Sequence, residues 1–137
     1  MLPKGYNWLW VIGCIILAGS LMRSAGSKLN KIDPPNDDWF QTEVVNQGKP
    51  VLVKFGAEWC GPCRAMEPVL AELSKSMAGH IHVVEIDVDK HPGLASHYRI
   101  SAIPRLFLFD HGKVVADRVG SETRDGLLKW IDEHFSK

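Results

Sequence analysis

Residues 51–63, which read VLVKFGAEWCGPC, are the stretch that decides the fold. The first half is an apolar run with the length and composition of a buried strand, and a helical apolar pattern follows the stretch. Two cysteines, Cys60 and Cys63, enclose a Gly-Pro pair at the start of that helix. Thiols spaced in this way can close to a disulfide and reopen, so the sequence predicts a dithiol–disulfide switch.

The composition is that of one ordinary globular domain with a short extension. The chain has 137 residues, 45% of them hydrophobic, and its 16 basic and 16 acidic residues cancel. No basic block is present, which argues against a nucleic-acid partner. A third cysteine, Cys14, lies far from the pair, and three cysteines are too few for a disulfide scaffold. The cysteine count therefore indicates chemistry rather than cross-linking.

The N-terminal 23 residues have the pattern of a membrane-directed segment. Residues 9–22 are almost wholly apolar, and extension back to Tyr6 gives about 17 residues, the lower limit for a membrane-spanning helix. We favour a retained signal anchor. Two alternatives stay open: a signal peptide cleaved near residues 18–20 or 24–26, and lipid attachment at Cys14, because VIGC at residues 11–14 resembles a bacterial lipobox.

This interpretation divides the chain into three parts. Residues 1–23 are the signal anchor or signal peptide, residues 24–35 are a polar linker, and residues 36–137 are the folded domain. We expect a monomer with a single N-terminal pass through the membrane and the domain outside the cytoplasm. The alternative is an exported soluble domain after signal cleavage.

The domain shows alternating helix and strand patterns. The helix between the first two strands is a crossover, so these strands should be parallel. A turn signal at residues 110–113 predicts an antiparallel hairpin. The prediction is an α/β fold in which a mixed sheet of about four strands has helices on both faces. The expected elements are a helix capped by Asn36 with Trp39 and Phe40 inward, strand 51–55, helix 61–78, strand 80–88, helix 92–98, strands 105–109 and 114–119, and a last helix capped by Ser121.

Residues 33–135 resemble the thioredoxin family. The resemblance rests on FGAEWCGPC at residues 55–63, Asp87 with Asp89, Ile103-Pro104, Gly112 and Gly120. It implies a thioredoxin fold, here preceded by an N-terminal hydrophobic helix, with a cis peptide bond before Pro104. It also implies a protein thiol–disulfide oxidoreductase, a protein-disulfide reductase whose redox group is the cysteine pair itself, with no bound cofactor or metal.

The resemblance and the helix start together predict the role of each cysteine. Cys60 would lie at the helix N-terminus, where unpaired N–H groups and the helix dipole favour its thiolate, so Cys60 is expected to attack substrate disulfides. Cys63, one turn further on, is expected to resolve the mixed disulfide. The expected partners are proteins with disulfides or thiols and an electron-donating thiol oxidoreductase. The expected substrate-binding residues are Trp59, Gly61, Pro62, Ile103 and Pro104, with Ala102 and Gly120 beside them.

Two other functions are compatible with parts of the pattern. One is a non-catalytic module that holds extended peptides in the groove at Ile103 and Pro104, although the intact cysteine pair argues against this as the main role. The other is a zinc site in which His80 and His82 complete a ligand set with the two cysteines. The Gly-Pro pair between the cysteines argues against zinc.

The chain departs from the family at one pair of charges, Lys54 and Glu85. Thioredoxins usually carry a buried Asp at the first position and commonly a Lys at the second. One interpretation is an ion pair of reversed sign without functional effect. The other is that the Lys54 ammonium favours the thiolate of Cys60 and thereby raises the reduction potential, while Glu85 takes the role of proton relay.

Overall fold

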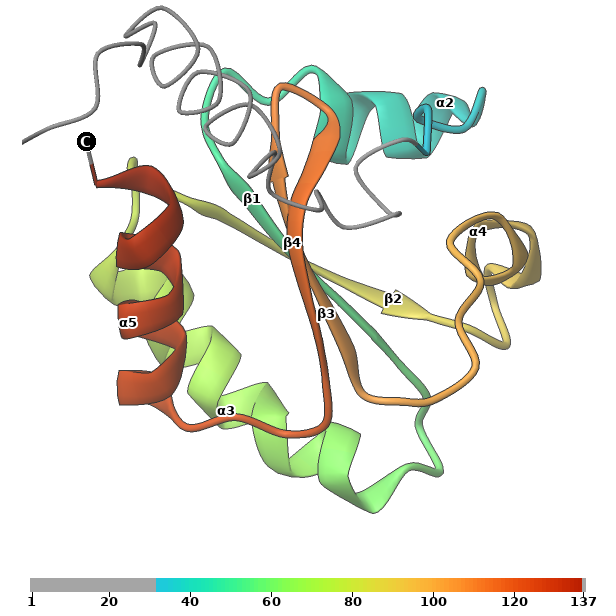
Figure 1. The fold of residues 1–137 in the computed structure, drawn as a ribbon. Coiled ribbons are helices and arrows are strands. Elements are labelled where there is room, and N and C mark those ends of the chain that lie inside the picture. The colour runs from blue at the N-terminus through green and yellow to red at the C-terminus, as the bar shows by residue number, and fades with distance from the viewer. Residues whose placement is uncertain (1–31, 137) are drawn as a thin grey trace, which may run out of the picture.

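A four-stranded sheet lies at the centre of the computed structural model, which describes residues 32–136 (Figure 1). The strands are β1 (Val51–Gly56), β2 (His82–Asp87), β3 (Arg105–Asp110) and β4 (Lys113–Val119), in the order β2-β1-β3-β4. The β1–β2 pair is parallel, and the β1–β3 and β3–β4 pairs are antiparallel. The predicted mixed sheet and its hairpin are confirmed.

Helices cover both faces of the sheet, as predicted (Figure 1). On one face lie α3 (Gly61–Ser76) and α5 (Arg124–Phe135). On the other lie α4 (Pro92–His97) and α2 (Asp38–Phe40), which continues into a π-helical turn, η2 (Gln41–Val45). Within residues 32–136, the helices are too short or too polar to cross a membrane. The hydrophobic helix expected before the domain, and Cys14 within it, fall outside the described residues.

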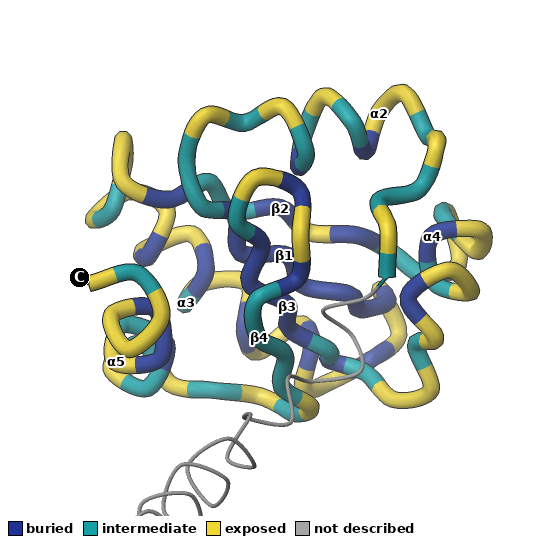
Figure 2. The backbone as a smooth tube through the Cα atoms, turned by 45° about the horizontal axis from the view of Figure 1, so that its top comes forward, coloured by how far each residue is buried: buried dark blue, intermediate teal, exposed yellow. Residues whose placement is uncertain are grey.

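The alternation of side chains along β1 creates two different cores. Val51, Val53 and Phe55 point to the α2/α4 face, while Leu52 and Lys54 point to the α3/α5 face. Buried residues run through the middle of the sheet, and the exposed ones lie on the outer sides of the helices (Figure 2). The α2/α4 side, which we call the aromatic layer, contains Phe40, Phe55, Tyr98, Phe107 and Phe109. The α3/α5 side, the aliphatic layer, contains Leu52, Met66, Leu70, Leu73, Leu106, Leu108, Leu127, Trp130 and Ile131.

Both predicted N-caps are wrong by one or two residues. Asp37, not Asn36, caps α2, and its carboxylate accepts the backbone N–H three residues on at 2.8 Å. Thr123, not Ser121, caps α5, and its hydroxyl accepts a backbone N–H at 3.1 Å. All four residue types can cap a helix, so tertiary packing decided which of them did.

The predicted second strand is also too long. The backbone N–H groups of His80 and Ile81 donate to the carbonyl of Met77, at 2.9 and 3.2 Å, and close the turn that ends α3. These two residues therefore belong to the turn that follows α3, and β2 begins only at His82.

One tryptophan lies elsewhere than predicted, and a second one, for which there was no prediction, is part of the core. Phe40 is buried as expected, but Trp39 is exposed and its ring stacks on His91 at 5.1 Å. Trp130, which had no predicted role, is buried in the aliphatic layer, where the Arg118 guanidinium lies 4.9 Å from its ring centre. The three-residue helix α2 is too short for a periodicity to define its inner face.

Candidate active site

Cys60 and Cys63 are joined in a disulfide at the N-terminus of α3. Cys60 is the N-cap residue, and its sulfur accepts the backbone N–H of Cys63 at 3.3 Å. Pro62 occupies the first turn, where a residue without an N–H leaves no helical hydrogen bond unmade. The Cys60 sulfur therefore lies at the positive end of the helix dipole, in the position that stabilises a thiolate.

The two cysteines differ slightly in burial. Cys60 is 6% exposed and Cys63 is 1% exposed, and they form one cluster with Ala57, against which Val88 and Ile103 pack. Cys60 is therefore the less buried of the two residues.

The predicted substrate-binding residues divide into exposed and buried ones. Trp59 is 71% exposed, and its indole N–H donates to the Asp89 carboxylate at 2.8 Å. Gly61 and Pro62 are exposed beside the disulfide, and Ile103 is half-buried against it. Three of these residues adjoin the cysteines in the chain and Ile103 packs against their cluster, and their binding of substrate stays a prediction.

Pro104 is different, because it is buried rather than part of the surface. The Ile103–Pro104 peptide bond is cis, as the resemblance implied. The Pro104 carbonyl accepts the backbone N–H of Gly120 at 2.8 Å, which ties the loop to the end of β4. Pro104 thus supports the loop that carries Ile103 but does not itself form part of the surface beside the disulfide. Val119, exposed at the end of β4, was missed by the sequence analysis, because its strand pattern gave no sign of an outward apolar residue.

Charged residues hold the loop that follows β2. The Asp87 carboxylate accepts the backbone N–H of Asp89 at 2.9 Å and so fixes the turn that carries the partner of Trp59. Beyond it, Lys90 forms an exposed ion pair with Glu58, and this hydrogen-bonded partner raises the pKa of Lys90. The two family positions Asp87 and Asp89 therefore serve the orientation of the Trp59 ring.

Lys54 lies directly beneath the disulfide. Its side chain is 5% exposed, and its ammonium forms an ion pair with Glu85 and donates to the carbonyl of Cys63 at 3.3 Å. The Glu85 side chain is 43% exposed, so the pair extends from the core to solvent. The structure thus brings together the two charges that the sequence analysis singled out.

The alternative zinc site is contradicted by the geometry. The cysteines lie at the N-terminus of α3, whereas His80 follows its C-terminus. A helix of 16 residues is roughly 24 Å long, so these groups cannot share one ion. Nor does any cluster of three or more histidine, cysteine or acidic side chains suited to a metal occur within residues 32–136.

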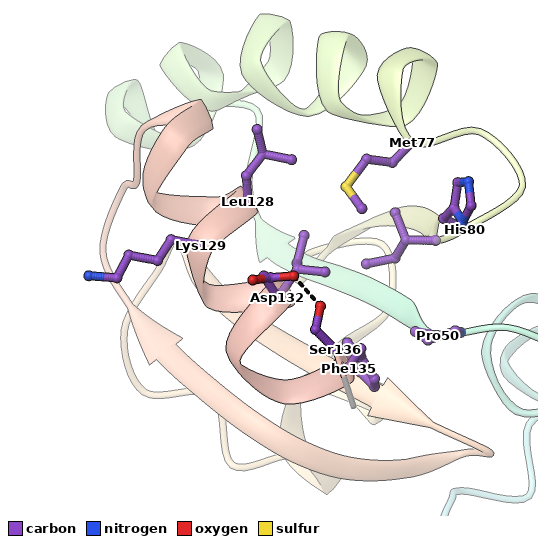
Figure 3. A pocket seen from close by; sticks show the side chains of 10 residues that line it. Pro50, Met77, His80, Leu128, Lys129, Asp132, Phe135 and Ser136 are labelled. Atoms are coloured by element: carbon purple, nitrogen blue, oxygen red, sulfur yellow. Dashed lines mark hydrogen bonds between the residues drawn. The ribbon is translucent and has the colours of Figure 1, made fainter.

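A cavity lies away from the cysteines, at the C-terminal ends of α3 and α5 (Figure 3). It measures about 730 Å³, and its walls are mainly apolar, with Met77, Leu128 and Phe135 among them. Lys129 and Asp132 stand at its rim, and the Asp132 carboxylate is hydrogen-bonded to Ser136 rather than free. Neither cysteine of the disulfide lines this cavity.

Comparison with known proteins agrees with this geometry. The family described as Thioredoxin matches residues 31–133. Thioredoxin C-2 of Corynebacterium nephridii is 44% identical over 99 residues, which cover 72% of this chain and 92% of that protein. Thioredoxins of Acidithiobacillus ferridurans and Rickettsia felis are 40% and 38% identical over 100 and 97 residues, covering 73% and 71% of this chain and 93% and 92% of theirs.

The family match covers all but the last three described residues, and the disulfide lies where the motif predicted it. Proteins of this family use an internal redox-active disulfide in place of a cofactor, and they exchange disulfides with protein substrates and reductant partners. The chain belongs to the thioredoxin family and is a protein thiol–disulfide oxidoreductase.

Proposed function

We propose that Cys60 is the nucleophile and Cys63 the resolving thiol when this protein reduces disulfides in other proteins. The Cys60 thiolate attacks one sulfur of the substrate, forms a mixed disulfide and releases the other sulfur as a thiolate. Cys63 then attacks Cys60, so the internal disulfide re-forms and the substrate leaves as a dithiol. The position of Cys60 at the N-cap, more accessible than Cys63, is the observation that carries this assignment.

The proposed substrate surface consists of the Trp59 ring, Gly61 with Pro62, Ile103 and Val119. Trp59 and Val119 are exposed large hydrophobic residues, and Ile103 contacts the disulfide cluster. Such a surface accepts extended apolar segments of many sequences, because it is shallow and offers few polar groups that demand a fixed partner.

Insulin reduction tests these roles with two matched variants. Cys60→Ser should lose turnover completely, whereas Cys63→Ser should stop after one step and accumulate a mixed disulfide with the substrate that gel electrophoresis without reductant detects. The assignment is wrong if the Cys60→Ser protein accumulates the adduct instead. The non-catalytic alternative requires that both variants support the protein's function unchanged and still bind unfolded peptides.

We also propose that the domain works outside the cytoplasm, held by an N-terminal anchor. The apolar run at residues 9–22 supports this, and the polar residues 24–35 provide a tether. A reductase in an oxidising compartment needs a membrane-borne electron donor, which this location would supply. Carbonate extraction of membranes, combined with thiol trapping of Cys60 and Cys63 in fractionated cells, reports location and redox state together. Recovery of the full-length protein in the cytosolic fraction contradicts the proposal.

A further inference from the structure

Lys54 is the single charged residue in the buried core of residues 32–136. Its neighbours on β1, Val53 and Phe55, are fully buried apolar residues that face the other way. An ammonium in such a place is costly unless it is paired, and here it has one carboxylate and one carbonyl partner. The carbonyl belongs to Cys63, so the charge is fixed at the redox centre.

Gly56 provides the room that brings Lys54 close to the sulfurs. A Cβ atom at Gly56 would lie 3.2 Å from the Cys63 sulfur and 3.3 Å from the Cε atom of Lys54. The sulfur and the Cε atom are both neighbours of that one point, so they are at most about 6.5 Å apart. Any larger residue at position 56 would compete with the lysine stem for this space.

The other charged residues that line the small cavity beside Lys54 are carboxylates, one of which, Glu58, is paired with Lys90. Glu58, Glu67, Glu85 and Asp87 line a small cavity of about 130 Å³ together with Lys54 and Gly56. The ammonium forms its ion pair with Glu85, whose half-exposed side chain is screened by water. The Lys54 side chain and both cysteines are buried, so water screens the ammonium from the sulfurs less than it screens the half-exposed Glu85 carboxylate.

We propose that Lys54 is a positioning residue that sets the redox poise: its buried charge, given access by Gly56 and held by Glu85, stabilises a thiolate in the reduced Cys60/Cys63 pair. Reduction transfers two electrons from a partner dithiol, which becomes a disulfide. The pair takes up two protons if it ends as two thiols and one if a thiolate remains. Lys54 favours the second outcome, so the protein is a stronger oxidant than its uncharged counterpart.

Equilibration with glutathione redox buffers between pH 5.5 and 9 tests the proposal, which rests on the proposed role of the cysteine pair. Lys54→Met should shift the exchange equilibrium at least tenfold toward the disulfide, equivalent to a fall of about 30 mV in reduction potential. It should also move the change from two-proton to one-proton dependence to a higher pH. A purely structural role for Lys54 predicts neither change.

Glu85→Gln tests the opposite change in charge to Lys54→Met, because it removes the negative partner of Lys54 while leaving the shape of the side chain. It should shift the exchange equilibrium toward the dithiol, and Glu67→Gln, a change at another cavity carboxylate, should shift it less. Gly56→Ala keeps every charge but crowds both the lysine stem and Cys63, so a shift in the same direction as in Lys54→Met supports the proposal only together with the charge variants. Glu85→Gln, with Glu67→Gln as its control, decides the matter if Lys54→Met does not fold.

Each outcome has a separate meaning. Equal potentials and equal proton dependence in wild type, Lys54→Met and Gly56→Ala overturn the proposal for Lys54. A wild-type protein that shows no disulfide–dithiol transition and no insulin reduction instead overturns the function proposed for the cysteines. Parallel shifts in Lys54→Met and Glu85→Gln contradict a charge effect, since the two variants remove charges of opposite sign.

Discussion

The two faces of the sheet contain equally buried side chains but have different tasks. The aromatic layer is closed and made of interlocking rings: Phe109 lies edge-on to Phe40 and Tyr98, with ring centres 5.7 and 5.6 Å apart. The aliphatic layer is open at both ends. One end has the large cavity beside Leu128, and the other has the small cavity beside Lys54 and the disulfide.

The difference teaches that chemistry and bulk stability come from opposite sides of the same strands. Each strand alternates its side chains, so β1 supplies apolar anchors to one face and Lys54 and Gly56 to the other. The cavity of about 730 Å³ also lies on the α3/α5 face but away from the cysteines. A substrate that is itself a protein chain needs an exposed surface beside the sulfur, and the size of a cavity is therefore a poor guide to this site.

The largest expected effect is on the aromatic layer. Phe109→Ala should lower the free energy of unfolding by about 3–5 kcal/mol, because it opens a cavity in a ring cluster that cannot collapse. The reduction potential of the folded protein should stay unchanged. Urea unfolding combined with glutathione titration measures both, and Phe109→Leu is the matched control, with a loss of less than about 1.5 kcal/mol. A shift of about 30 mV or more in the reduction potential of Phe109→Ala would show that the aromatic layer also affects the redox chemistry.

A smaller effect is expected at the charged end of the aliphatic layer. Glu85→Ala should lower the free energy of unfolding by about 1–2 kcal/mol, because it leaves the Lys54 ammonium buried without its counter-ion, while the half-exposed carboxylate limits the loss. The double variant with Lys54→Met should recover most of that stability. If the double variant is less stable than Glu85→Ala alone, the buried ammonium is not the source of the loss.

Tyr98 tests whether an unsatisfied buried hydroxyl lowers the stability of the aromatic layer. Its hydroxyl is buried with no hydrogen-bond partner among the described residues, and burial raises its pKa well above the ordinary 10.0. The folded protein therefore holds the proton that the unfolded chain releases above about pH 10, so stability falls as the pH rises beyond that value. Tyr98→Phe should change the free energy of unfolding by less than about 1 kcal/mol at pH 7.

The informative readout for Tyr98→Phe is its pH dependence. Above pH 10 the stability of the variant relative to wild type should grow by up to about 1.4 kcal/mol per pH unit, since only the wild type has a tyrosine at this site to ionise on unfolding. Parallel stability curves for the two proteins from pH 7 to 11 would contradict the assignment.

The smallest effect is expected at the large cavity. Leu128→Gln should leave insulin reduction within about twofold of wild type, because the cavity lies at the far end of α3 from the sulfurs. Trp59→Ala is the contrast at the surface, where loss of an exposed contact ring should lower kcat/KM about tenfold. Steady-state kinetics of the two variants compare the cavity at Leu128, which is remote from the sulfurs, with the surface at Trp59, which lies beside Cys60. A tenfold loss in Leu128→Gln would make the cavity part of the substrate site.

Several features followed directly from local sequence. The apolar run before Cys60, the Gly-Pro pair and the helical pattern after it predicted the β1–α3 unit, and the spacing of Asp110 and Lys113 predicted the hairpin. The N-cap predictions were wrong because neighbouring polar residues are equally able to cap a helix, as Asn36 and Asp37 show. The predicted burial of Trp39 was wrong because a helix of three residues is too short to show a periodicity.

The sequence by itself predicted the reaction, because a Gly-Pro pair between two thiols at a helix start and the family motifs around it favour disulfide exchange, and it showed that Lys54 and Glu85 depart from the family pattern. Only the tertiary structure decided the access to each sulfur, the burial of Pro104 and the contact of Lys54 with Cys63. The physical reason is distance along the chain. A strand residue and a helix residue nine positions apart meet only because α3 folds back over the sheet, and the depth of the resulting site depends on both layers.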